Sequence, residues 1–142
     1  MKTNKHRMAG FSLIELMIVV VIISILAAIA IPSYRQYVLR GHRTDATRAL
    51  QDLASRQENY FFSNNEYTNN LSLLGANANV AGQYFTVSVS IPAGSSSTDY
   101  LITATAQGTQ VQDSACTAFT LARSGEKGSS GTGLADTCWG GR

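Results

Sequence analysis

The sequence contains few of the residues that build catalytic or metal sites. It has two histidines, His6 and His42, and two cysteines in 142 residues. Neither histidine belongs to a Cys, His or Asp cluster with the spacing of metal ligands. A phosphate-binding lysine motif, a Gly-x-Gly-x-x-Gly turn and a Gly-x-Ser-x-Gly nucleophile turn are also absent. The sequence therefore predicts no enzyme activity and no cofactor.

Charged residues make up 14% of the chain and are unevenly placed. Three of the 11 basic residues, Lys2, Lys5 and Arg7, lie within the first ten positions. Without that segment, eight basic residues face nine acidic ones. The remaining chain then has no overall attraction for nucleic acid, which is not an expected partner. The one dense basic cluster consists of Arg35, Arg40, Arg43 and Arg48.

A single long apolar run dominates the first quarter of the chain. Residues 11–31 are apolar except for Ser12, Ser24 and Glu15. As a helix this run would span ~31 Å, the thickness of the hydrocarbon core of a bilayer. The basic residues before it would keep the N-terminus in the cytoplasm and send the rest across. A conventional secretory signal with a cut near 27–30 is the alternative, but its apolar core would be shorter.

Glu15 is the anomaly within this run. A carboxylate in a membrane-spanning helix costs roughly 2.5–3.5 kcal/mol. A cut after Gly10 would create an α-amine on Phe11, one helical turn away, and this amine could compensate the charge. Alternatively, the carboxylate lies near the interface and reaches the headgroups. The residue types alone leave both interpretations open.

The N-terminal sequence resembles the signature of type IV pilins. The matching residues are Gly10-Phe11-Ser12-Leu13-Ile14-Glu15-Leu16-Met17, an Ile/Val run, and Ala30-Ile31-Pro32-Ser33-Tyr34. The resemblance implies cleavage between Gly10 and Phe11 by a prepilin peptidase and N-methylation of Phe11. It also implies that Glu15 compensates the Phe11 amine of a neighbouring subunit during assembly. Other pilin subunits, the N-methyltransferase and the inner-membrane assembly platform are the implied protein partners, and the lipid bilayer holds the chain before assembly.

The resemblance implies an α+β fold, the pilin α/β-roll, in which one long N-terminal helix packs on a short antiparallel sheet. Three segments are expected: a cleaved basic leader (1–10), a transmembrane and assembly helix (11–32, the stem) and a periplasmic part (33–142, the head). Pro32 predicts a kink in the helix. The chain would lie in the inner membrane before assembly and in an extracellular pilus afterwards.

A helical pattern continues beyond Pro32 to about residue 63. The predicted buried stripe consists of Tyr34, Tyr37/Val38, Ala46, Ala49/Leu50, Leu53, Gln57 and Tyr60/Phe61. The predicted solvent face carries Arg35, Arg43, Asp45, Arg48, Asp52, Arg56 and Glu58. His42 is a lone histidine and is expected to be a helix-surface residue rather than a ligand. Asp52 and Arg56 are four residues apart and are expected to pair.

Three strands are predicted in the second half of the chain, at 83–91, 100–106 and 116–121. Alternation places Phe85, Val87, Val89 and Ile91 on the face toward the helix, and Tyr100, Ile102, Ala104 and Ala106 on one face of the next strand. The segment up to Gly82 is expected to be a loop held by Tyr67, Leu71, Leu73 and Leu74. Residues 124–131 are also expected to be a loop.

Cys116 and Cys138 are the only cysteines, and both follow the membrane anchor. In an exported protein such a pair favours one disulfide, which should contribute ~3 kcal/mol by closing its loop. Two unrelated buried thiols are the alternative. A calcium site formed by Asp99, Asp113 and Asp136 is a minor alternative without any supporting spacing.

The C-terminal pattern Cys-x-x-Phe-x-Leu, Gly-Glu-Lys-Gly and Cys-Trp resembles the minor pilins, although some major subunits share it. A minor pilin is therefore the first expectation. The alternatives are a pseudopilin of a type II secretion system, which would usually lack the late disulfide, and a DNA-uptake or competence pilin, which would need a basic patch.

Overall fold

A computed structural model describes residues 11–95 and 97–140, so the leader and Gly10 lie outside the described residues. One helix, α1 (Leu13–Asn64), accounts for 52 residues and runs without interruption through Pro32. It passes through two compact units, one ending at Gln36 and one beginning at Tyr37. The predicted helical end near residue 63 is thus confirmed to within a residue.

The second unit contains a four-stranded antiparallel sheet with the strand order β1-β2-β3-β4. Its strands are β1 (Phe85–Ser90), β2 (Leu101–Ala106), β3 (Ala118–Ala122) and β4 (Lys127–Ser130). Two 3-10 helices, η1 (Leu71–Leu74) and η2 (Gly108–Gln112), and a short α2 (Ala135–Cys138) complete it. The expected α+β pilin fold is confirmed. The predicted loop over 124–131 is wrong, because four of its residues form β4.

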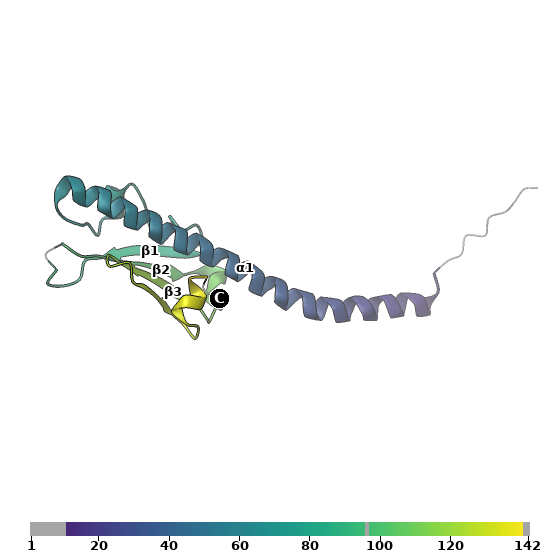
Figure 1. The fold of residues 1–142 in the computed structure, drawn as a ribbon. Helices are drawn as coiled ribbons and strands as arrows, with labels where there is room; N and C mark the ends of the chain where they lie inside the picture. Colours follow the sequence, from purple (N-terminus) through teal and green to yellow (C-terminus); the bar gives the residue numbers. More distant parts are fainter. Residues whose placement is uncertain (1–10, 96, 141–142) are drawn as a thin grey trace, which may run out of the picture. The chain divides into compact units, whose positions relative to one another are not determined.

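The sheet buries one face, and Figure 1 shows it along one side of the C-terminal half of α1. Phe85, Val87 and Val89 alternate with exposed residues along β1. The register then pairs Val87 with Ala104 and Ala104 with Phe119, so apolar residues form a row across three strands. These residues share a core cluster with four buried residues of α1, namely Ala46, Ala49, Leu50 and Leu53. The predicted faces of the first two strands are confirmed, although Ile91 and Ala106 are only half-buried.

The buried stripe of α1 begins later than the sequence predicts. Its buried residues are Leu39, Ala46, Ala49, Leu50, Leu53 and Gln57. Tyr34 and Tyr37 are 69% and 76% exposed, so their prediction as stripe residues is wrong. Their spacing fits the stripe, but the core of the head begins only at Leu39.

The segment between α1 and β1 is held mainly by Tyr67 and Leu74, which are buried. Leu73 is 56% exposed, so its prediction as an anchor is wrong. The chain leaves η1 through Gly75 in the left-handed conformation, with φ of 65°. Arg56 Nη1 donates to the carbonyls of Leu74 and Gly75, both at 3.0 Å, and so fixes this turn on α1.

Candidate functional site

The stem is an apolar helix whose side chains are not buried by other described residues of its unit. Its large apolar side chains from Phe11 to Ile31 are all exposed, and the most apolar 18-residue window of α1 has a mean hydropathy of 3.0. By length and composition α1 is the one described helix able to cross a membrane. Such a surface has to be covered by lipid or by other protein.

The carboxylate of Glu15 is in the first turn of α1. Among residues 11–95 and 97–140 the ion pairs are Arg43–Asp113 and Arg56–Asp52, so Glu15 has no charged partner in the described chain. Phe11 lies just before the helix and is 79% exposed. Ser24, the other polar residue inside the run, donates to the Val20 carbonyl at 2.7 Å and so needs no outside partner.

In the head, Arg43 and Asp113 form a bidentate ion pair. The Nε and Nη2 atoms of Arg43 donate to the two carboxylate oxygens of Asp113 at 2.7 and 2.8 Å. Both side chains are largely buried, with 12% and 3% exposure. Arg43 was predicted on the solvent face of α1, and that prediction is wrong. The segment after η2 folds back over this side of the helix, a long-range contact that helical spacing cannot reveal.

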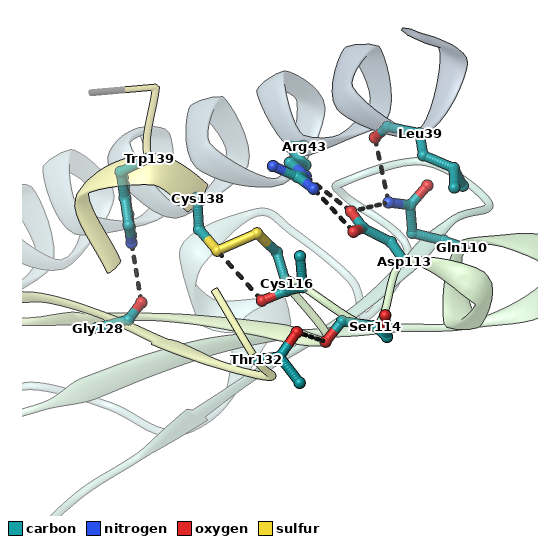
Figure 2. Close-up of a disulfide and its surroundings, with 11 residues drawn as sticks. Leu39, Arg43, Gln110, Asp113, Ser114, Cys116, Gly128, Thr132, Cys138 and Trp139 are labelled. Carbon is teal, nitrogen blue, oxygen red and sulfur yellow. Dashed lines mark hydrogen bonds and ion pairs between the residues drawn. A yellow bond between two sulfur atoms is a disulfide. The ribbon is translucent and has the colours of Figure 1, made fainter. Parts of the chain in front are cut away.

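The Gln110 side chain is fully buried and extends the same network to Leu39, as Figure 2 shows. It also reaches His42. Its amide Nε2 donates to the Leu39 carbonyl at 3.2 Å and to Asp113 Oδ2 at 3.1 Å. Because both of these groups are acceptors, Gln110 Oε1 must accept from His42 Nδ1, 2.9 Å away. The His42 ring also stacks on Tyr84, with centroids 3.6 Å apart. His42 is therefore a packing residue, not the free helix-surface residue that was predicted.

The two cysteines form the predicted disulfide, with an S–S distance of 2.02 Å (Figure 2). It joins the segment just before β3 to the last residue of α2. Trp139 follows it directly, donates from Nε1 to the Gly128 carbonyl at 2.8 Å and packs edge-on against Phe119. A Cβ atom on Gly131 would lie 2.5 Å from the Ala115 carbonyl oxygen, so a glycine is required for the C-terminal segment to lie this close.

A second polar cluster closes the other end of the head. Tyr67 Oη donates to Glu58 Oε2 at 3.1 Å and accepts from Arg123 Nε at 3.0 Å. Tyr100 Oη lies 3.4 Å from Glu58 Oε1. Burial raises the pKa of the Tyr100 hydroxyl to about 12, and the Glu58 carboxylate adds to the rise. The bond to Tyr67 raises the pKa of Arg123 above its ordinary value. The sequence predicted Tyr67 as an anchor but not this cluster.

Two arginines of the described head are held in ion pairs. Arg43 is held by Asp113, and Arg56 by Asp52 at 2.8 Å as predicted. An open groove of about 590 Å³ between α1 and residues 80–84 is lined by Arg48 together with Asp45 and Asp52. Two carboxylates beside one guanidinium make this groove a poor site for an anion.

The three aspartates considered for calcium do not come together. Asp113 is paired with Arg43, and Asp99 accepts a hydrogen bond from the backbone N–H of Tyr100 at 2.8 Å. Within the described ranges there is no group of three His, Cys, Asp or Glu residues able to hold a metal ion.

Two family models match this chain, and together they cover most of it. The family described as "Type IV minor pilin ComP, DNA uptake sequence receptor" matches residues 32–120. The prokaryotic N-terminal methylation motif matches residues 5–31. The first match covers the helical and sheet core of the head, and the second covers the stem and part of the leader.

Individual relatives are fimbrial proteins. The chain is 37% identical over 107 residues to "Fimbrial protein EcpC" of Eikenella corrodens, covering 75% of this chain and 68% of EcpC. It is 46% identical over 65 residues to "Type IV wide pilus major component PilA4" of Thermus thermophilus, covering 46% of this chain and 50% of PilA4. A "Fimbrial protein" of Neisseria meningitidis is 35% identical over 77 residues, which span 53% of this chain and 45% of that protein.

Proposed function

Since the chain belongs to the type IV pilins, we propose that it is a structural subunit of a type IV pilus, and specifically a minor one. The name of the family matching residues 32–120 supports the minor assignment. A subunit of this kind acts by assembly and performs no chemistry on a substrate. Its leader, residues 1–10, is removed by the prepilin peptidase, and Phe11 is then N-methylated.

The main support for this proposal is the contrast between the exposed apolar surface of the stem and the folded, disulfide-bonded head. The apolar side chains of the stem are exposed, whereas the head has its own core and disulfide. The stem anchors the chain in the inner membrane before assembly, with residues 33–142 in the periplasm. In the filament, stems pack against one another, so their apolar surface moves from lipid to protein without meeting water.

Glu15 supplies the register of this packing. Its carboxylate, which has no charged partner in the described chain, pairs with the Phe11 amine of a neighbouring subunit. That pairing offsets the cost of holding a charge in an apolar environment. Pro32 marks the point where the stem kinks as it leaves the filament core.

The test is incorporation into filaments. A Glu15→Val chain should remain in the membrane fraction but be missing from sheared filaments. Glu66→Val removes an exposed carboxylate of the head and should assemble normally. Normal assembly of Glu15→Val would overturn the role given to Glu15. A Gly10→Ser chain should keep residues 1–10, and a mature N-terminus at Phe11 in that variant would refute the cleavage site.

A second candidate function, supported by the name of the matching family, is binding of a DNA uptake sequence. The exposed arginines Arg35 and Arg40 could contact phosphates. With two such contacts the slope of log affinity against log salt would be about −2, and Arg40→Gln would remove about one unit of it. Fluorescence anisotropy of labelled duplexes measures this slope, and no binding at low salt would reject the candidate.

A pseudopilin of a type II secretion system remains the rival assignment. It would share the leader and Glu15, but usually lacks a late disulfide like Cys116–Cys138. Loss of secreted enzymes from a strain deleted for this chain, with pili intact, would favour that rival.

A further inference from the structure

The end of the head where the chain arrives from the stem presents three exposed side chains of different chemistry. Tyr37 is 76% exposed, Val111 is 58% exposed, and Arg40 is also exposed. Val111 belongs to η2, which is fixed beside the first helical turns of the head through the bond from Gln110 to the Leu39 carbonyl. These three residues, here named the resting surface, therefore belong to one end of one unit.

Chain length limits how far this surface can lie from a bilayer that holds the stem. The apolar run ends at Ile31, six residues before Tyr37. Six helical residues rise ~9 Å, and even fully extended they reach only ~20 Å. The interfacial layer on each side of the hydrocarbon core is itself roughly 5–7 Å thick. Tyr37 thus stays close to the headgroups whatever the arrangement of the two units.

The chemistry of the three side chains suits that environment. A tyrosine has an apolar ring and a polar tip, and it is enriched at the membrane–water interface. An arginine with no acidic partner among the described residues is free to meet a phosphate group. An apolar side chain exposed on a short helical turn can enter the upper part of the acyl chains.

We propose that the resting surface binds anionic phospholipid headgroups of the periplasmic leaflet while the chain awaits assembly. This inference rests on the membrane anchoring proposed above. The contact holds the head against the bilayer and is released when the stem leaves the lipid. A neighbouring pilin subunit is the other conceivable occupant of this surface, and the experiment below separates the two.

The first experiment uses tryptophan fluorescence of the full chain in vesicles whose lipids carry bromine near the headgroup. Val111→Trp places a reporter in the resting surface. Leu73→Trp is the matched control, because Leu73 is 56% exposed and lies on η1. The η1 helix is fixed near Arg56, ~25 Å further along α1 than Leu39. Trp139 remains in both chains, and the unsubstituted chain gives its contribution.

The proposal predicts several-fold stronger quenching of Val111→Trp than of Leu73→Trp. Vesicles that hold the chain alone, at high lipid-to-protein ratio, contain no neighbouring pilin to occupy the surface. Equal quenching at both positions, or none at position 111, would overturn the proposal.

The second experiment tests the charge. Adding phosphatidylglycerol to phosphatidylethanolamine vesicles should raise the quenching of Val111→Trp, and Arg40→Gln should lower the ratio of docked to undocked heads about fivefold. Arg48→Gln, an exposed arginine eight residues further along α1, should leave it unchanged. An identical response of the two variants would reject the headgroup contact.

These outcomes are separable from failure of the proposed function. A chain that stays in the membrane and enters filaments, but shows no quenching at position 111, rejects only the resting surface. A chain that does not partition into membranes at all rejects the anchoring, and the resting surface with it.

Discussion

The large apolar residues of the stem are exposed, whereas many of those in the head form a buried core. In the stem the most apolar window of 18 residues contains no buried residue, whereas in the head Phe85, Phe119 and Ile102 are fully buried. The same chemical type of residue therefore serves an external partner in one region and an internal core in the other. The head can therefore complete its own fold, while the apolar surface of the stem has to be covered by lipid or by other subunits.

Truncating one large apolar side chain in the head and one in the stem should give the largest difference in unfolding free energy between the two regions. Phe119→Ala removes a fully buried ring and should lower the free energy of unfolding of the head by ~3–5 kcal/mol. Ile22→Ala, at a stem position that is 51% exposed, should change it by less than ~0.5 kcal/mol. Urea titrations of the detergent-held chain, followed by Trp139 fluorescence, measure both. Equal losses of unfolding free energy for the two variants would show that the stem contributes to the stability of the head as much as the head's own core does.

Removing the disulfide should have the next largest effect, again confined to the head. The double variant Cys116→Ala, Cys138→Ala should lose ~3 kcal/mol of unfolding free energy, because the unfolded chain regains the entropy of an open loop. A reductant should bring the unsubstituted chain to the same protease sensitivity and leave the double variant unchanged. Unchanged protease resistance in the double variant would argue against a stabilising role.

Two aspartate–arginine pairs, one buried and one exposed, allow a finer comparison inside the head. Asp113→Asn leaves the largely buried Arg43 without its counter-ion and should cost about 1.5–3 kcal/mol. Asp52→Asn breaks a pair whose side chains are 39% and 50% exposed and should cost less than ~1 kcal/mol. The same urea titration measures both, and a larger loss for Asp52→Asn would contradict the network described around Gln110.

The smallest effect appears only at alkaline pH. The pKa of Tyr100 is raised to about 12 in the folded head, above the ordinary 10.0 of an unfolded chain. The folded state therefore keeps its proton where the unfolded state loses it, so stability is complete below pH 10 and falls as the pH rises toward 12. Tyr100→Phe should flatten this part of the stability profile. If the stability profile of Tyr100→Phe is unaltered, groups other than Tyr100 cause the loss of stability at alkaline pH.

Local patterns predicted those parts of the fold that depend on neighbouring residues. The alternation of Phe85, Val87 and Val89 gave strand β1 and its buried face. In contrast, β4 consists of Lys-Gly-Ser-Ser, which has neither alternation nor β-branched residues. Its place comes from pairing with β3 and from Trp139, whose indole binds the Gly128 carbonyl. Such support is invisible in the local sequence.

The candidate site divides in the same manner. The roles of Phe11 and Glu15 rest on a short motif and stay predictions. The hydrogen-bond partners of His42 and Arg43, in contrast, lie about 70 residues away in the chain. The sequence places Arg43 on the solvent side and His42 at the helix surface, because helical spacing cannot foresee that η2 and the residues after it fold back. The prediction for Tyr37 failed in the opposite direction. Its spacing fits the buried stripe, but spacing does not show that the core begins only at Leu39.

The central claim is that the stem is processed and then carried into a filament. Mass spectrometry of sheared filaments and of the membrane fraction tests it most directly. We expect filaments to contain this chain beginning at an N-methylated Phe11, at a low ratio to the main subunit. Finding it only in membranes, with residues 1–10 still attached while other pilins fill the filaments, would contradict the account.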